Sequence, residues 1–344
     1  MLVLTVSGGA LQCNPPESTQ IVHQGRRVYA SMCAVCHGDD REGYKADQAP
    51  SLAQTDFLAS VTNEHLSTAI TDGRRGTTMS AWGTVRGGPL SPREVTAVVA
   101  FLRSYQDGPK VKLDERPLTG DTTRGQEIYG RECVGCHEAR GVGGRFEGIG
   151  NQQLLATASN GFLRHAIKHG RTGTAMPAFE SLGDQAIDDL VALLRSFQRT
   201  PLLPTQHEEV AKPPPLPLGP VPLNPKGPEP QHFNATPGFT SADVVNAQLA
   251  RHARMGILDA RAPSDYTQNH IAGAVSVPFY DPEPYIKDLP KDAWLVAYCG
   301  CPHAESGTLA RKLAEKGFTK VTVIDEGLGY WTRKKYPTAS GALP

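Results

Sequence analysis

The pattern of apolar and polar positions separates the chain into parts with different expected structures. Three short apolar runs in the C-terminal part predict buried strands, at 255–261, 293–299 and 320–327. Two other segments there predict helices, at 241–253 with Ser241 near its cap and at 305–317 ending on a glycine. Short buried strands interleaved with helices are typical of an α/β domain with a parallel sheet.

The N-terminal part contains one pattern twice, which indicates an internal duplication. Three blocks recur in the same order with nearly equal separations: 25–37 and 125–137, 70–82 and 167–179, 98–106 and 190–198. The first pair reads GRRVYASMCAVCH and GQEIYGRECVGCH, so that glycine, tyrosine, both cysteines and histidine share their offsets. We therefore expect one domain to be present twice.

A proline-rich segment separates the duplicated part from the α/β part. Residues 201–237 contain 12 prolines and few bulky apolar side chains. Such a segment cannot bury a core and favours extended polyproline II, so we expect a semi-rigid spacer. A peptide ligand for a proline-recognising module is the alternative.

Length and charge narrow the function classes. A chain of 344 residues exceeds one ordinary core, so two or three domains are expected. Lys and Arg together number 35, as do Asp and Glu, and no long run of either sign gives the electrostatic footprint of a nucleic-acid-binding protein. No stretch approaches the roughly 20 apolar residues that cross a bilayer.

Residues 1–19 look like the tail of an export signal, with a short apolar run and small residues before Cys13. The segment resembles the cleavage site of a bacterial lipoprotein, in which Cys13 would carry a lipid anchor. It departs from that pattern at Gln12, where a small residue is usual, and in lacking a basic start. An ordinary export signal is the alternative, and both predict a periplasmic or membrane-surface protein.

Four of the seven cysteines form two C-x-x-C-H motifs: Cys33, Cys36 and His37, then Cys133, Cys136 and His137. In this motif the thiols can form thioether bonds to the two vinyl groups of a haem, and the histidine becomes an axial ligand of the iron. A zinc knuckle would need two further ligands at matching spacing. A dithiol redox motif would not require the histidine in both copies. The motifs therefore predict two covalently bound haems c.

The sixth iron ligand is expected on a later loop. Met79 and Met176 occupy equivalent places in the second repeated block, 42 and 39 residues after their histidines. A thioether opposite histidine raises the reduction potential relative to two histidines. Either methionine could instead pack in the core, in which case the next candidates for the ligand are His65, His165 and His169.

Residues 20–107 and 120–199 each resemble a small class I cytochrome c domain. The resemblance rests on the C-x-x-C-H turn, the methionine loop and a closing amphipathic helix. It implies an all-α fold in which the first and last helices cross through Gly25 and Tyr29 and their equivalents. The first copy has Ser80 after its methionine, where the family usually has the proline that the second copy has at Pro177.

Residues 238–338 resemble the rhodanese domain. The resemblance rests on ILDARAPSDYTQNHIAGAVSVP, with its D-x-R and the turn at His270–Ala274, on the YC strand end, and on GFTKVTVIDEGLGYW. It implies that Cys299 takes up a sulfane sulfur as a persulfide. A thiol between a strand end and a helix start has its thiolate stabilised by loop amides and the helix dipole.

The stretch YCGCPHAESG leaves alternatives open. Cys301 could replace Cys299 as the reactive thiol or resolve its persulfide, and the two could oxidise together or bind copper with His303. His303 is the only cation in GCPHAE, where Glu305 is negative, so a dianionic donor such as thiosulfate is poorly matched. Glu326 also stands where the family often has glycine.

These features predict an exported dihaem cytochrome c that carries single electrons between redox proteins of a respiratory chain. The rhodanese-like domain predicts a sulfane-sulfur donor as a further partner. Two alternatives remain at this stage: a sulfurtransferase whose haems oxidise sulfur substrates, or an electron carrier on which an inactive rhodanese fold only docks a partner.

Overall fold

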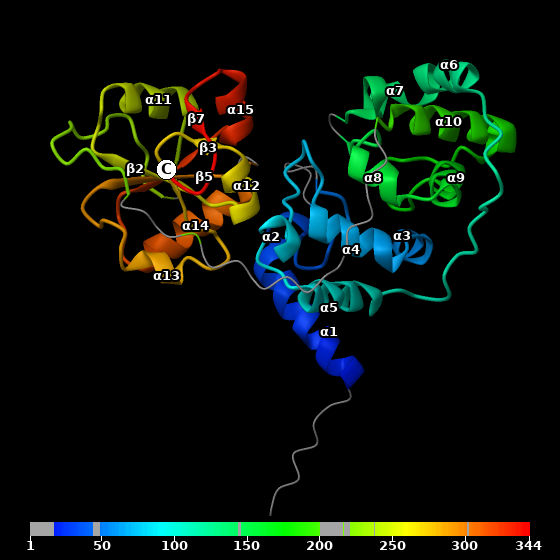
Figure 1. Cartoon of the computed structure of the whole chain (residues 1–344), viewed down its shortest axis with the longest axis horizontal. Helices are drawn as coiled ribbons and strands as arrows, with labels where there is room; N and C mark the ends of the chain where they lie inside the picture. The colour runs from blue at the N-terminus through cyan, green and yellow to red at the C-terminus, as the bar shows by residue number, and fades with distance from the viewer. Residues whose placement is uncertain are drawn as a thin grey trace, which may run out of the picture.

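As predicted, two all-helical units precede an α/β unit with a parallel sheet (Figure 1). The computed structural model describes residues 17–43, 49–143, 146–199, 216, 221–236, 238–300 and 303–344. Cys13, Cys301 and most of the proline-rich segment lie outside the described residues. Among the described helices, none is both long and apolar enough to cross a membrane.

The first helical unit consists of α1 (Glu17–Val28), η1 (Tyr29–Cys33), α2 (Ala34–His37), α3 (Thr55–Ser60), α4 (Asn63–Asp72), η2 (Thr84–Arg86) and α5 (Pro92–Arg103). The closing helix begins with a capping box, in which the Ser91 hydroxyl and the Glu94 carboxylate each accept a bond from the other residue's backbone N–H. A proline at the first helical position completes this start signal. Local sequence therefore fixes where α5 begins.

The first and last helices of this unit cross at a glycine. A Cβ placed on Gly25 would lie 1.9 Å from the carbonyl oxygen of Ala97, so only glycine permits the approach. One turn later the rings of Tyr29 and Phe101 lie 5.1 Å apart, and the Tyr29 hydroxyl donates to the Gly38 carbonyl at 2.8 Å. This crossing holds α2 against the core.

The second helical unit consists of α6 (Thr122–Glu132), α7 (Val134–His137), η3 (Ala139–Gly141), α8 (Gln152–Thr157), α9 (Asn160–His169), η4 (Glu180–Leu182) and α10 (Asp184–Phe197). It repeats the crossing, since a Cβ on Gly125 would lie 2.2 Å from the Asp189 carbonyl oxygen. The Tyr129 hydroxyl donates to the Glu138 carbonyl at 2.7 Å, as its counterpart does in the first unit. The crossing expected from the sequence repeat is present in both copies.

The α/β unit consists of β1 (Phe239–Thr240), α11 (Ala242–Ala250), β2 (Met255–Asp259), α12 (Pro263–Gln268), β3 (His270–Ile271), β4 (Ala274–Ser276), α13 (Glu283–Ile286), β5 (Trp294–Tyr298), α14 (Ala304–Glu315), β6 (Val321–Ile324), α15 (Gly327–Arg333) and β7 (Thr338–Ala339). Its main sheet is wholly parallel, in the order β1-β6-β5-β2-β4. The central strands are buried on both faces, which explains their continuous apolar runs.

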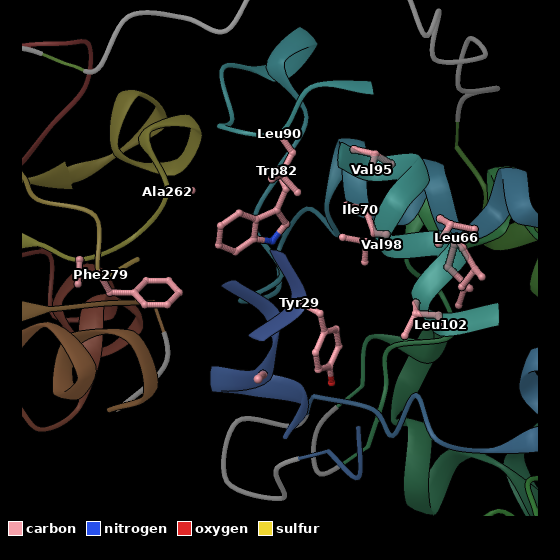
Figure 2. Packing of buried hydrophobic residues seen from close by; sticks show 14 of the residues in the cluster. Tyr29, Leu66, Ile70, Trp82, Leu90, Val95, Val98, Leu102, Ala262 and Phe279 are labelled. Carbon is pink, nitrogen blue, oxygen red and sulfur yellow. The ribbon is translucent and has the colours of Figure 1, made fainter. Parts of the chain in front are cut away.

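The α/β unit lies against the first helical unit, although the second unit separates them in sequence (Figure 1). Helix α14 packs against α2. Trp82, which is 5% exposed, lies edge-on to Phe279 and Tyr280 with ring centroids 6.4 and 5.7 Å away. Figure 2 shows the Trp82 indole turned toward Phe279 and Ala262. The chain therefore folds back on itself after the second unit.

Candidate functional sites

The first C-x-x-C-H motif lies on α2 and the residues just before it. His37 is buried, and its Nδ1 lies 2.9 Å from the Pro50 carbonyl oxygen. A carbonyl can only accept, so Nδ1 carries the proton and Nε2 has its lone pair available for a metal. Burial lowers the pKa of His37, which favours this neutral form, and raises the pKa of Cys33 to about 12.

The second motif repeats this arrangement in a more open setting. The Nδ1 of His137 lies 3.0 Å from the Glu147 carbonyl oxygen, so its Nε2 is likewise available. Burial is the main cause that raises the pKa of Cys133, to about 11. Cys136 is exposed, whereas Cys36 is half-buried in the first unit. The two motifs share their local bonding and differ in exposure.

The two methionine loops have the same backbone network. The Met79 carbonyl accepts from Arg74 N–H at 2.9 Å, and the Met176 carbonyl accepts from Arg171 N–H at 3.1 Å. In each loop the methionine N–H donates to a threonine hydroxyl two residues earlier, at 3.1 Å. Both methionines are half-buried, and Met79 packs against the core. The sequence repeat therefore extends to the conformation of each loop.

The alternative histidine ligands lie elsewhere in the two units. His65 is buried, with Nε2 3.1 Å from Arg74 Nη2 and Nδ1 3.0 Å from Thr157 Oγ1, so both ring nitrogens already have partners. His165 and His169 lie 4.6 Å apart, ring to ring, and line a cavity of about 170 Å³ beside Lys168. Both of these histidines lie on α9.

Two arginines at equivalent positions carry an unsatisfied guanidinium nitrogen. Nη1 of Arg74 and Nη1 of Arg171 are buried and have no hydrogen-bond partner among the residues that the structure describes. Burial lowers the pKa of both side chains. A buried guanidinium nitrogen without a hydrogen-bond partner is costly, so both positions are suited to an anionic group from outside the chain. Sequence analysis missed this pair, although both arginines follow the repeated glycine of the second block.

The two arginines also lie where the helical units meet. The guanidinium of Arg171 lies 5.5 Å from the ring centre of Phe57 in the first unit. The backbone N–H of Thr172 donates to the Asp56 carboxylate at 3.2 Å, and the Asn151 amide donates to the Arg75 carbonyl at 3.0 Å. The loops that carry the methionines therefore form part of the contact between the units.

Cys299 follows the last residue of β5 and is fully buried. Its Sγ lies 3.2 Å from Ser306 Oγ in the first turn of α14. The backbone N–H of Leu328, in the first turn of α15, donates to the Cys299 carbonyl at 2.9 Å. The expected placement between a strand end and a helix start is present, while Cys301 lies outside the described residues.

The D-x-R motif is a buried structural pair. Arg261 Nε lies 2.9 Å from Asp259 Oδ1, and its Nη2 also donates to the Asn269 carbonyl at 2.6 Å. The Tyr298 hydroxyl donates to the same Asp259 carboxylate at 2.6 Å. The Asp259 carboxylate raises the pKa of Arg261 against the opposing effect of burial. Arg261 is thereby fixed as a support for the end of β5.

The surroundings of α14 include His303, which the sequence analysis considered, and Arg311 and Lys312, which it did not. His303 Nε2 lies 2.8 Å from the Asp325 carboxylate. Arg311 and Lys312 line an open cleft of about 590 Å³ between α14 and α2, which Asp39 also lines. Lys312 donates to the Phe279 carbonyl at 2.9 Å. Helical spacing could have indicated that these two side chains reach the same side as the start of α14.

Glu326, which departs from the family pattern, caps a helix. Its carboxylate accepts a hydrogen bond from the Ala242 N–H at 2.8 Å. An acidic group at a helix N-terminus offsets the helix dipole and satisfies a backbone donor that has no partner within the helix. The replacement of glycine therefore ties α11 to the loop after β6.

Comparisons with known proteins agree with this division. The family model described as cytochrome c oxidase, cbb3-type, subunit III matches residues 20–102 and 120–194. The rhodanese-like domain model matches residues 241–334.

Two solved structures are similar to parts of the chain. A reducing HAO-like protein complex of Kuenenia stuttgartiensis covers 51% of this chain and 96% of its own, at 21% identity and a TM-score of 0.37. A rhodanese-like domain from Anabaena covers 30% of this chain and 78% of its own, at 27% identity and a TM-score of 0.28.

Curated relatives match about half of the chain. The cbb3-type cytochrome c oxidase subunit FixP of Bradyrhizobium diazoefficiens is 29% identical over 167 residues, which are 46% of this chain and 54% of that protein. The cytochrome bc1 complex cytochrome c subunit of Mycobacterium leprae is 24% identical over 213 residues, which are 57% of this chain and 71% of that protein. The chain thus spans about half the length of the first of these relatives.

Cytochrome c domains imply covalently bound haem c, and the residues present fit such a group. Haem carries two carboxylates, which match the unpartnered nitrogens of Arg74 and Arg171. After both pairs of thiols, the histidine Nδ1 is bonded to a backbone carbonyl, which leaves Nε2 for the iron. The chain is therefore built from helical cytochrome c domains followed by a rhodanese-like α/β domain with a parallel sheet.

Proposed function

We propose that the chain is a dihaem electron carrier whose two haems are held by duplicated sets of residues. Cys33 and Cys36 attach the first haem, with His37 and Met79 as axial ligands. The second set is Cys133, Cys136, His137 and Met176. The observation that carries this proposal is that both copies repeat the histidine Nδ1–carbonyl bond and the methionine-loop network.

The protein side chains set the properties of each site. The carbonyl oxygen that accepts a hydrogen bond from Nδ1 fixes the histidine tautomer. It also makes the lone pair of Nε2 a stronger electron donor to a metal. A methionine loop stiffened by its threonine presents a thioether, which favours the reduced iron relative to a second imidazole. Arg74 and Arg171, each with a buried unpartnered nitrogen, would pair with haem carboxylates. When bound, the haem supplies one-electron chemistry.

We propose that the second cytochrome domain exchanges electrons with other proteins. Cys136 is exposed and Val134 is 37% exposed, whereas α14 packs against the equivalent helix of the first domain. The relatives named above are subunits of respiratory complexes. A redox protein of a respiratory chain is therefore the partner that we propose.

We also propose that the carrier works in the periplasm or at a membrane surface. The support is residues 1–19, which look like an export signal, with Cys13 as the position for a lipid. Mass spectrometry of the mature N-terminus tests this directly. A diacylglyceryl modification on Cys13 supports the anchor, and an unmodified N-terminus beyond residue 13 contradicts it.

The haem assignment is tested by counting. Denatured, acid-extracted protein should keep its haem colour, and a pyridine haemochrome assay should give two haems per chain. The double variants Cys33→Ala/Cys36→Ala and Cys133→Ala/Cys136→Ala should each retain one. A count of one in the wild-type protein contradicts the assignment of one motif, and the variant that keeps its colour identifies which.

A second function, sulfur transfer at Cys299, is favoured by the position of its thiol between β5 and α14. The Cys299 thiolate would attack the outer sulfur of a persulfide or polysulfide donor, releasing the donor thiolate and forming a Cys299 persulfide. Cyanide would then take that outer sulfur as thiocyanate and restore the thiolate. The buried thiol and the pairing of His303 with Asp325 favour such donors over thiosulfate.

Sulfur transfer is tested by mass and by transfer to cyanide. Incubation with polysulfide should add one sulfur to the peptide that contains Cys299. Cys299→Ser should abolish thiocyanate formation and leave both haem spectra intact, while Cys301→Ser should reduce it if Cys301 resolves the persulfide. A wild-type protein that takes up no sulfur contradicts this second function and leaves the electron carrier unaffected.

A further inference from the structure

The rhodanese-like domain holds the loop that carries Met79. The Ser80 hydroxyl donates to the Asp265 carboxylate at 2.6 Å, and the Ser264 hydroxyl donates to the Ala81 carbonyl at 2.7 Å. Ser80 and Ser264 are buried, and both residues from the rhodanese-like domain lie in the first turn of α12. Two adjacent hydrogen bonds therefore join α12 to the two residues that follow the proposed iron ligand.

The same contact extends to the end of β5. A side chain added at Gly300 would meet Thr78 Cγ2 at 3.8 Å and Arg261 Cδ at 3.7 Å. Gly300 follows Cys299, and Thr78 precedes Met79. Gly300, directly after the candidate sulfur site, therefore lies near Thr78, the residue before Met79, whereas Ser80 is the residue after Met79.

Trp82, Phe279 and Tyr280 form an aromatic cluster at the other end of this contact. The Trp82 backbone N–H donates to the Ile70 carbonyl at 3.0 Å, which fixes the loop to α4. The indole packs against Phe279 (Figure 2) and against Tyr280. Ser80, Ala81 and Trp82, which follow Met79, are therefore in contact with the rhodanese-like domain.

The second cytochrome domain shows what the loop does without this contact. Pro177 takes the place of Ser80 there and is exposed, and Phe179, the counterpart of Trp82, is half-buried. Proline stiffens its own loop by fixing φ, whereas serine does not. In the first domain the loop is held from outside, because the Ser80 hydroxyl bonds to Asp265 of the rhodanese-like domain. A proline at this position would have no such hydroxyl.

We propose that Ser80 and Asp265 are positioning residues that hold Met79 on the first haem, so that the rhodanese-like domain controls access of small ligands to that iron. This inference rests on the proposed function, in which Met79 is the axial ligand. With the contact intact, Met79 stays in place. With it broken, the loop opens more often, and a competing ligand reaches the iron more easily.

The test uses the full haem-loaded chain and imidazole as the competing ligand. The variants Met79→Ala and Met176→Ala first identify which spectral change belongs to which haem. In Asp265→Ala we expect imidazole to bind the first haem roughly tenfold more tightly, the size expected for loss of one buried hydrogen bond. We also expect its reduction potential to fall, with no change at the second haem.

Matched variants separate positioning from a general loss of structure. Asp265→Asn keeps an acceptor for Ser80 and should restore wild-type imidazole affinity. Ser80→Ala should reproduce Asp265→Ala, and the double variant should be no worse than either, because both remove the same bond. Pro177→Ser in the second domain should not mimic these effects on the first haem.

The outcomes distinguish this inference from the function on which it rests. If Met79→Ala leaves the sulfur-to-iron charge-transfer band unchanged, the ligand assignment itself is wrong. If Met79 is a ligand but neither Ser80→Ala nor Asp265→Ala changes the imidazole affinity or potential of the first haem, the positioning role is overturned. Additive effects in the double variant also overturn it.

Discussion

The two cytochrome domains share an interior and differ at the surface. Both have the glycine crossing, the histidine bonded through Nδ1 and the threonine-stiffened methionine loop. In the first domain, however, α2 packs against α14, and Ser80 after the methionine is buried and bonded to α12. In the second domain Val134 and Cys136 on the equivalent helix and Pro177 after the methionine are exposed. The duplicated copies have thus kept the residues that serve a haem, while their outer faces have taken on different partners.

The largest expected effect is the loss of an axial ligand. Met79→Ala and Met176→Ala should each remove about half of the near-infrared sulfur-to-iron band of the ferric protein. Each should lower one potential by on the order of 100 mV, a fraction of the about 0.8 V that axial ligands span. Redox titration followed in the visible spectrum measures both. If each substitution shifts both haems, the domains do not act as separate sites.

The second prediction compares Trp82 with its counterpart Phe179. Trp82→Ala should lower the free energy of unfolding by about 3–5 kcal/mol, because it leaves a cavity between two domains. Phe179→Ala should cost less than about 2 kcal/mol, since Phe179 is only half-buried. Urea unfolding measures both. Equal costs would show that the aromatic contact with the rhodanese-like domain contributes nothing beyond that of a loop residue.

The third prediction concerns pH and the pair His65 and Phe162, which are equivalent in the two repeats and lie 5.5 Å apart, ring to ring. Burial, followed by the charge of Arg74, lowers the pKa of His65 to about 4. The folded protein therefore resists protonation that the unfolded chain accepts. The resulting stability is complete above pH ~6.5 and is lost as the pH falls toward ~4.

For His65 this loss should amount to at most about 3 kcal/mol. His65→Phe, which copies the second domain, should flatten the stability profile between pH ~6.5 and ~4. Urea midpoints at several pH values measure the slope of each protein. A variant with the wild-type slope would show that another group causes the acid sensitivity.

The smallest effect is expected at the residue after each C-x-x-C-H motif. Gly38 has φ 80° and ψ 154°, and Glu138 has φ 55° and ψ 178°. Glycine adopts this region without strain, whereas glutamate is strained there. Glu138→Gly should therefore stabilise the second domain by about 1 kcal/mol. This is the strain relieved minus the larger conformational entropy that glycine loses on folding. Gly38→Ala should destabilise the first domain. Thermal unfolding that moves in the opposite direction contradicts the strain.

The sequence predicted the parts of this molecule that depend on local spacing. C-x-x-C-H, the repeated methionine and the YC strand end are short patterns, and each fixes a conformation within a few turns. The parallel sheet followed from apolar runs at 255–261, 293–299 and 320–327. These features need no knowledge of which domains touch.

The contacts between domains could not be predicted in this way. Ser80 and Asp265 lie 185 positions apart, and each is an ordinary polar residue in its own segment. Ser80 was recognisable as a departure from the family pattern, but a single sequence does not say which residue compensates for it. The same holds for Arg74 and Arg171, whose unsatisfied nitrogens become visible only once burial is known.

The return of the rhodanese-like domain to the first cytochrome domain changes how strong their contact has to be. Two domains on one chain meet at an effective concentration that the length and stiffness of the connecting segment set. A contact made of the α14–α2 packing, two hydrogen bonds and one aromatic cluster can then stay mostly formed even if it is weak between separate proteins. Because the contact is also weak enough to open, cutting the chain between residues 200 and 220 should release the rhodanese-like domain at micromolar concentrations.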